Sequence, residues 1–192
     1  VSPQVLTDGV TEVTITYTEG RITKTASVPV TVKKVLVSIA ITANPTKMTY
    51  QYLETFDPAG MVVTATYSDE SSEEVSGYTH SPDAFSALGQ QAVQIQYAYE
   101  GVTKTASLTV TVNPIEVAVP VQNGVLTYDG ETKTPAWTGY GTGKMTISGE
   151  TNGVNAGTYS AKFVLDYGYV FPGGQNEATV SWVIDRAVIA SP

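Results

Sequence analysis

The sequence "TKTASVPVTV" occupies residues 23–32, and the sequence "TKTASLTVTV" occupies residues 103–112. The two stretches lie 80 residues apart, and the match between them extends back toward the N-terminus. Residues 9–32 laid on residues 89–112 give 12 identities in 24 positions without a gap. A module that ends in this pair of segments therefore occurs at least twice in the chain.

The matched residues alternate along the chain. Val13, Ile15 and Tyr17 share one face, which is the two-residue period of a half-buried strand and not the 3.6-residue period of a helix. "TEGR" and "YEGV" lie between the matched strands and predict hairpin turns. The composition agrees, because the chain has 28 Thr and 26 Val but only 7 Leu, and side chains branched at Cβ favour pleated strands. The sequence predicts an all-β fold.

The direction of the apolar side chains changes near Lys33 and Lys34. Apolar residues stand at even positions in 28–32 and at odd positions in 35–41. Since a strand changes its inward parity only through a bulge, the change predicts a module boundary at the lysines, with Val35, Val37, Ile39 and Ile41 facing the next core. Asn113-Pro114 predicts a second boundary, because Pro lacks the N–H that a ladder needs.

These boundaries divide the chain into four predicted parts. They are the C-terminal part of a repeat at 1–34, a complete repeat at 35–113, a β-sandwich of a second type at 114–186, and the start of a following linker or strand at 187–192. In the complete repeat we expect strands near 35–42, 61–67, 74–79, 91–99 and 102–112. "HSPDAFSALG" at 80–89 predicts one helical turn, with Ser81 as N-cap and Pro82 at the first helical position.

Residues 114–186 are rich in turn signals, such as Asn123-Gly124 and Asp129-Gly130, and short alternating strands between dense turns predict a sandwich. Alternation places Tyr159, Ala161, Phe163 and Leu165 on one face and Val180, Trp182 and Ile184 on another. The spacing from Asn155 to Tyr159 fits a tyrosine corner, in which a Tyr hydroxyl bonds to upstream backbone. The residues predicted to be structural are Tyr159, Trp182, Tyr97 and Tyr17.

The composition also argues against several classes of function. The formal net charge is −8 and the pI is about 4.5, so the chain repels phosphate backbones and nucleic acid is not expected as a partner. The longest apolar run, 35–43, is far shorter than the ~20 residues of a membrane helix, so no membrane insertion is expected. No Cys is present, so no disulfide framework is expected.

Two long segments carry a resemblance to a known family. "SIAITANPTKMTYQYLETFDPAGMVVTATYSDESSEEVSGY" at 38–78 and "LGQQAVQIQYAYEGVTKTASLTVTV" at 88–112 resemble a bacterial immunoglobulin-like (Ig-like) repeat of Gram-positive surface proteins. Glu70 departs from the pattern, because such repeats often carry Gly there. "TYDG", "NAGTYSAKF" and "SWVIDRA" in 114–186 are similar to a second family of short Ig-like repeats, found on bacterial surfaces and in phage virion proteins. The resemblance implies tandem Ig-like β-sandwich modules at an extracellular location.

No catalytic constellation is predicted. His80, Ser81 and Asp83 are the residue types of a hydrolase triad, but near-consecutive residues of one loop rarely converge on one reacting atom. "GYGTGK" at 139–144 is followed by Met145 where a phosphate-binding loop needs Ser or Thr. We therefore expect no enzyme and no cofactor.

Two groups of residues are candidate sites for a ligand. "SDESSEE" at 68–74 is a weak candidate for calcium through Asp69, Glu70, Glu73 and Glu74, although a solvated hairpin that deters edge pairing is the favoured interpretation. The aromatic residues near the loops of 114–186 are candidate platforms for a glycan or a protein, although core packing is the favoured alternative. These aromatic candidates are Trp137, Tyr140, Tyr167 and Tyr169.

Three functional hypotheses follow. The first is a non-catalytic spacer rod of a bacterial cell-surface or secreted protein, whose partners are neighbouring Ig-like repeats and a host protein or glycan. The alternatives are an accessory carbohydrate-binding module of a secreted glycoside hydrolase and a phage tail or decoration protein. Residues 1–34 lack the strands on which they should pack. We expect them to pair with another copy of the chain, with the C-terminal "AVIASP" at 187–192, or with a missing piece.

Overall fold

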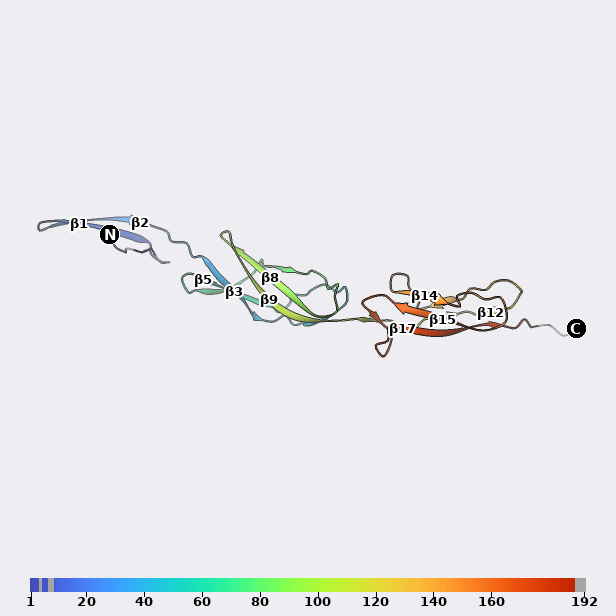
Figure 1. Cartoon of the computed structure of the whole chain (residues 1–192). Helices are drawn as coiled ribbons and strands as arrows, with labels where there is room; N and C mark the ends of the chain where they lie inside the picture. The colour runs from blue at the N-terminus through green and yellow to red at the C-terminus, as the bar shows by residue number, and fades with distance from the viewer. Residues whose placement is uncertain (4, 7–8, 189–192) are drawn as a thin grey trace. The chain divides into compact units, whose positions relative to one another are not determined.

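The computed structural model describes residues 1–3, 5–6 and 9–188, so the predicted linker or strand at 187–192 lies mostly outside the described residues. The described chain is all-β and contains no helix, as the alternation predicts (Figure 1). Within those ranges no helix is long and apolar enough to span a membrane. The chain forms two compact units. One comprises Val1–Thr49, Thr55–Ala84 and Gln90–Val110, and the other comprises Tyr50–Glu54, Phe85–Gly89 and Thr111–Pro192.

A pair of strands at the N-terminal end forms a sheet of its own. β1 (Glu12–Glu19) pairs antiparallel with β2 (Ile22–Pro29), from Glu12 opposite Pro29 to Glu19 opposite Ile22. A single bridge joins Ser2 to Thr14 at the outer edge of β1. We call β1 and β2 the ribbon, and most of its side chains are exposed.

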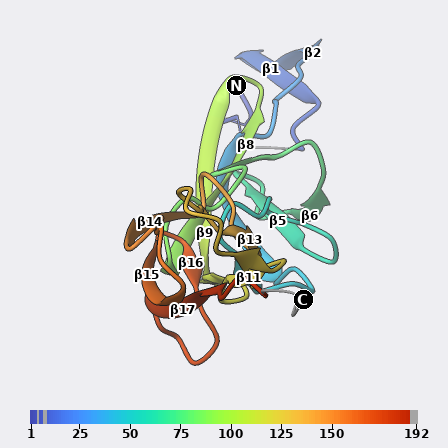
Figure 2. The same cartoon turned by 90° about the vertical axis from the view of Figure 1, so that its right-hand side faces the viewer.

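Seven strands follow and form two sheets, in the orders β3-β5-β6 and β4-β9-β8-β7. β5 and β6 lie side by side in Figure 2. Their bounds are β3 (Leu36–Ala43), β4 (Thr49–Gln51), β5 (Val62–Tyr67), β6 (Ser72–Val75), β7 (Thr79–Ser81), β8 (Gly89–Tyr99) and β9 (Val102–Asn113). Alternate residues of β5 and β8 are buried, and Tyr67 of β5 contacts Tyr99 of β8 with ring centroids 5.1 Å apart. The seven strands therefore build a sandwich, which we call the middle sandwich.

The predicted inward direction of Val35 and Val37 is wrong. Both side chains are about half exposed, at 49% and 50%, whereas Leu36 between them is 1% exposed. The pairing of β3 with β5 shifts register between Leu36 and Ser38, so Val37 is the extra residue of a β-bulge. The parity change therefore lies inside β3 at this bulge, and not at Lys33 and Lys34.

The predicted helical turn at 80–89 and the predicted single strand at 74–79 are also wrong. β6 ends at Val75, and β7 begins at Thr79 in the other sheet, where His80 pairs with Ile95 of β8. Ala84 then makes a bridge with Thr55, and the next side chain, Phe85, is buried. Pairing with distant strands therefore takes the place of the local hydrogen bonds that a helical turn needs.

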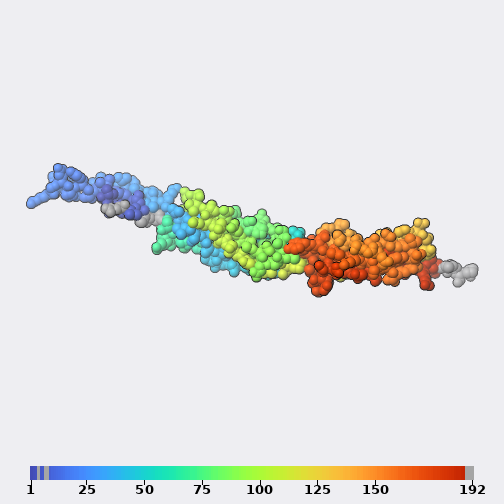
Figure 3. All heavy atoms as spheres, in the orientation of Figure 1, coloured from blue at the N-terminus to red at the C-terminus, as the bar shows by residue number. Residues whose placement is uncertain are grey.

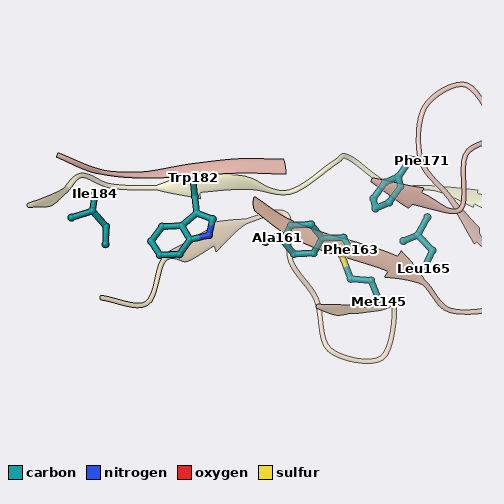
Figure 4. Close-up of a cluster of buried hydrophobic side chains, with 7 residues drawn as sticks. All are labelled: Met145, Ala161, Phe163, Leu165, Phe171, Trp182 and Ile184. Atoms are coloured by element: carbon teal, nitrogen blue, oxygen red, sulfur yellow. The ribbon is translucent and has the colours of Figure 1, made fainter. Parts of the chain in front are cut away.

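The remaining strands build the C-terminal sandwich, whose main sheet has the order β12-β17-β15-β14. Their bounds are β10 (Ile115–Glu116), β11 (Val121–Asn123), β12 (Leu126–Thr127), β13 (Ala136–Thr138), β14 (Met145–Gly149), β15 (Gly157–Leu165), β16 (Tyr169–Val170) and β17 (Glu177–Asp185). Tyr159 lies opposite Trp182 and Ala161 lies opposite Val180, so the two predicted apolar rows line the same face of one sheet. Seven buried side chains form the core on this face (Figure 4): Met145, Ala161, Phe163, Leu165, Phe171, Trp182 and Ile184.

Phe163 occupies the middle of this core, and its replacement tests the packing. Phe163 is fully buried, so Phe163→Ala leaves a cavity and is expected to lower the free energy of unfolding of the C-terminal sandwich by about 3–5 kcal/mol. Both Trp residues of the chain, Trp137 and Trp182, belong to this sandwich. Trp fluorescence during urea unfolding therefore reports the change. Val125→Ala, at a side chain that is 76% exposed, should change the value by less than about 0.5 kcal/mol, and equal effects of the two variants would contradict the described core.

Candidate functional site

A lysine at the start of the middle sandwich is enclosed by aromatic and acidic groups. The Lys34 Nζ lies 3.7 Å from the ring centroid of Tyr67 and 5.9 Å from that of Tyr99. It also donates a hydrogen bond of 3.0 Å to Oε1 of Glu73. We call Lys34, Tyr67, Glu73 and Tyr99 the Lys34 cluster. A cation held over an aromatic face and beside a carboxylate is attracted by both groups.

The strand register explains how Glu73 reaches the lysine. Glu73 lies opposite Ala65, which is fully buried, so it points toward the inner side of the edge strand β6. Inward-pointing charges on edge strands discourage pairing with other sheets. The neighbouring Lys33 forms an ion pair with Glu100 at 3.1 Å. The two successive lysines thus pair with different elements, Lys34 with β6 and Lys33 with the turn between β8 and β9.

The electrostatics of the Lys34 cluster favour its charged groups. The Tyr67 hydroxyl and, after it, the Lys34 ammonium hold the pKa of the Glu73 carboxyl below its ordinary value. The hydrogen bond to Glu73 raises the pKa of Lys34. Burial raises the pKa of the Tyr67 hydroxyl above its ordinary value. The cluster thus carries a charged pair against a phenol.

The four carboxylates of the calcium candidate are not brought together. Glu73 and Glu74 are successive residues of β6 and point to opposite faces, while Asp69 accepts hydrogen bonds from the backbone N–H and the hydroxyl of Ser71. The Ser71 bonds lower the pKa of the Asp69 carboxyl. Glu70 has a φ of 65°, the left-handed conformation that favours Gly, which explains why similar repeats often carry Gly there. In the described part of the chain, no three His, Cys, Asp or Glu side chains form a group that could hold a metal ion.

His80, Ser81 and Asp83 do not form a triad geometry. The His80 ring packs edge-on against Phe56 with centroids 5.1 Å apart, and its Nδ1 lies 3.6 Å from Oδ1 of Asp83. Ser81 follows His80 on the same strand and therefore points to the opposite face. The strand separates the hydroxyl from the imidazole.

Two of the aromatic platform candidates pack on the core of the C-terminal sandwich. Trp137 is half-buried and meets Phe163 edge-on at 4.9 Å between ring centroids. Tyr140 is also half-buried and lies 6.0 Å from the same ring. The loop at 139–144 therefore takes part in the core through Tyr140, and no helix follows it that could bind a phosphate.

The other two aromatic candidates contact a third tyrosine. Tyr52 meets Tyr167 at 5.6 Å and Tyr169 at 6.1 Å, both edge-on. The hydroxyl oxygen of Tyr167 accepts a hydrogen bond of 2.9 Å from the backbone N–H of Leu88. We call Tyr52, Tyr167 and Tyr169 the tyrosine cluster. All of these residues belong to the second compact unit.

The backbone around the tyrosine cluster is tightly fitted. Gly168 has a φ of 94°, and a Cβ at this position would lie 2.1 Å from a ring carbon of Tyr52. The backbone N–H of Ile115 donates to the Gly168 carbonyl oxygen, and that of Tyr52 donates to the Asn113 carbonyl oxygen. Only Gly at position 168 therefore permits this contact.

The residues predicted to be structural differ in their surroundings. Tyr159 donates a hydrogen bond of 2.8 Å to the Asn155 carbonyl oxygen, which is the bond that the tyrosine-corner spacing predicts. Its ring stacks on the buried Trp182 at 4.5 Å. Tyr97 is half-buried in the middle sandwich. The equivalent Tyr17 of the ribbon is 64% exposed.

The roles of Lys34 and Tyr52 are not predicted from the sequence. The sequence predicts only that Lys33 and Lys34 are exposed residues at a module boundary, and it indicates no role for Tyr52. The sequence does contain the elements of the Lys34 cluster, namely an acidic hairpin and aromatic residues in two predicted strands. Their convergence depends on the pairing of β5 with β6 and on the packing of two sheets, which residue patterns alone do not specify.

Comparison with known proteins identifies the middle sandwich. Residues 43–112 match the model of the family described as bacterial Ig-like domain (group 3). This segment is a bacterial Ig-like domain. The match spans less than half of the chain, and it includes β4 to β8 and most of β9.

The comparisons with whole proteins add little detail. Among solved structures, the chain is similar to the S-layer protein rSbsC(31-844), with 15% identity and a TM-score of 0.30. The similarity covers 93% of this chain and 32% of that chain, so the chain spans about a third of the length of that protein. The comparison with curated proteins finds no match.

The lowered pKa of Glu73 predicts how the stability of the Ig-like domain depends on pH. A carboxyl whose pKa is lower in the folded state contributes stability above its unfolded pKa of about 4.3, and that contribution is lost as the pH falls through the folded value. Glu73→Gln should therefore reduce the loss of stability between pH 5 and pH 2, measured by urea unfolding at each pH. Glu74→Gln, on the other face of β6, is the matched control and should keep the wild-type pH dependence. A steeper acid dependence in Glu73→Gln would contradict the role assigned to Lys34 and Tyr67.

Gly168 allows a test of the tyrosine cluster. Gly168→Ala places a methyl group against the Tyr52 ring, so it should displace Tyr167 and expose the Leu88 amide to hydrogen exchange. Gly173→Ala is the matched control, since Gly173 also has a positive φ, 79°, but no atom lies within 4 Å of its Cβ position. Both variants carry backbone strain, and only Gly168→Ala should accelerate exchange at Leu88, measured by NMR. Equal acceleration in both would show that strain alone is responsible.

Proposed function

We propose that the chain is a non-catalytic structural part of a bacterial cell-surface or secreted protein, in which Ig-like modules space other domains. The observation that carries the proposal is the connection between β9 and β10, which consists of Pro114 alone. One residue that lacks an N–H and has a fixed φ leaves little freedom to bend. A short connection of this kind suits a spacer better than a flexible tether.

The surroundings of the candidate side chains support the same proposal. Lys33 and Lys34 are paired with Glu100 and Glu73, which stiffens the connection before β3. Trp137 and Tyr140 pack on Phe163, so their rings lend stability to the core. The bacterial Ig-like domain at 43–112 fits an extracellular, structural role. Adhesion to a host protein or glycan would then depend on other domains of the complete protein.

The spacer function predicts a defined maximum dimension in solution. Small-angle X-ray scattering should give a narrow distance distribution for the chain. Inserting Gly-Ser-Gly-Ser between Asn113 and Pro114 should broaden this distribution, because the added residues behave as a flexible coil.

The control places the same insertion between Gly173 and Gly174 in an exposed turn, where it should leave the distance distribution unchanged. A wild-type distribution that is already as broad as that of the first insertion variant would contradict the spacer function. A glycan-array signal that disappears in Trp137→Ala would instead favour a binding module.

A further inference from the structure

The ribbon has two chemically different faces. Residues directly opposite each other in β1 and β2 share a face, and Val13 is opposite Val28, Ile15 is opposite Ala26, and Thr16 is opposite Thr25. One face therefore carries Val13, Ile15, Tyr17, Ile22, Ala26 and Val28, with the charged Glu19 and Lys24 toward the turn. The other face carries Thr14, Thr16, Thr18, Thr23, Thr25 and Ser27, with Glu12 and Pro29 at the far end. The ribbon is mainly apolar on one side and mainly hydroxyl-rich on the other.

In the described part of the chain, most side chains of this apolar face are exposed to solvent. Ile15 is 45% exposed, Ile22 is 66% exposed and Val28 is 48% exposed (residues 12–29, blue spheres in Figure 3). β1 and β2 form a two-stranded sheet of their own. An isolated two-stranded hairpin is at best marginally stable in water, so the face requires a partner.

The internal repeat shows what covers the equivalent face elsewhere in the chain. The residues that correspond to Val13, Ile15 and Val28 at a distance of 80 are Val93, Ile95 and Leu108, and these are 0%, 0% and 8% exposed. They lie on β8 and β9, whose inner face meets the sheet β3-β5-β6 in the middle sandwich. The two faces match in sequence and differ in what covers them.

The segment that leads into the ribbon is repeated as well. Ser2-Pro3 aligns with Ser81-Pro82 when a gap of one residue is placed in the first copy, between positions 8 and 9. The backbone N–H of Ser2 donates to the Thr14 carbonyl oxygen at 2.9 Å, and the N–H of Thr14 donates to the Ser2 carbonyl oxygen at 2.8 Å. Ser81 pairs in the same way with Gln94, the residue that corresponds to Thr14. In both copies, therefore, a Ser-Pro segment pairs with the equivalent position of the next strand at the edge of the sheet.

We propose that the apolar face of the ribbon is a docking surface for a three-stranded antiparallel sheet of the kind that residues 36–75 form. We assign this sheet to the same polypeptide, joined on the N-terminal side of Ser2. Ser2 already enters the ribbon in the register that Ser81 uses, so a sheet attached there arrives in the correct orientation. Attachment in the same chain also gives a high effective concentration, which offsets part of the entropy of closing the sandwich.

A second copy of the chain is a poorer occupant. Its own β3-β5-β6 sheet already covers β8 and β9, because Val63 and Ala65 are 1% and 0% exposed. It has only its ribbon to offer, and two ribbons face to face would bring just two strands to each side. Docking on the ribbon is separate from the spacer function, since it concerns the structural class of the segment that the ribbon binds.

The test joins a second copy of residues 35–80 directly to Ser2 in the full chain, in place of Val1. The amides of β1 and β2 should then exchange with solvent roughly 100-fold more slowly than in the unextended chain, because they become part of a cooperative unit. Hydrogen exchange followed by NMR gives this comparison, with the amides of β8 and β9 as an internal reference for a folded sandwich. Exchange in β1 and β2 that is unchanged by the extension overturns the proposal.

Two variants of the extended chain separate docking on the apolar face from general ordering. Ile15→Asp places a charge on the apolar face and should abolish the added protection. Thr16→Asp places the same charge on the hydroxyl-rich face and should retain the protection. Equal loss in both variants contradicts a face-specific contact. A dimeric mass for the unextended chain, with β1 and β2 already protected, also overturns the proposal and identifies a second copy as the occupant.

Discussion

The covering of apolar sheet faces is the constraint on which this structure depends. Each sheet of alternating Thr and Val has one face that water disfavours, and the gain from covering it is about 25 cal/mol for each Å² of apolar surface. In the C-terminal sandwich, Phe163 and Trp182 of neighbouring strands share the covered face with Trp137 and Tyr140 around them. In the middle sandwich, two separate sheets cover each other, and their buried residues alternate with exposed polar ones. In both cases the backbone pattern is a simple alternation, and the partner of each face determines whether the pattern leads to a core.

Charged and aromatic residues meet at the margins of the cores, near the places where strands begin and end. Glu73 turns inward from the edge strand β6 and meets Lys34, so that the edge carries charge. Lys34 in turn lies over the ring of Tyr67, and burial raises the pKa of the Tyr67 hydroxyl. Tyr52 makes a comparable contact without charge, since its ring packs against Gly168 and two further tyrosines. These contacts are partly exposed, and exposed ion pairs contribute little stability.

The alternating strands could be predicted from the sequence, while the departures from alternation could not. Val62–Tyr67 and Val102–Asn113 follow the predicted segments within a residue, because long alternating runs allow one assignment only. The bulge at Val37 could not be predicted, since Leu36 and Val37 are equally apolar. Only the pairing of Leu36 with Tyr67 determines which of the two side chains points into the core. The helical turn at Ser81-Pro82 was predicted from capping residues, and pairing of His80 with Ile95 overrode this local preference. Among the candidate ligand residues, chemistry could be read from the sequence, but the directions of Glu73 and Glu74 depend on strand register, which a run of acidic residues does not encode.

The two copies of the repeat separate the information in a strand from the effect of its surroundings. In the first strand of the repeat, the three residues of the apolar face, Val13, Ile15 and Tyr17, are identical in the second copy. The residues between them are Thr14, Thr16 and Thr18 in one copy and Gln94, Gln96 and Ala98 in the other. Solvent-facing positions accept many residues, whereas a packed face restricts the size and shape of each side chain. In this strand the identity is confined to the apolar face, which is what a packing constraint produces, whereas Thr23 to Ser27 of the second strand are identical on both faces. The first strand of the ribbon therefore has a sequence that suits a covered state, although most of its apolar face is exposed in the structure.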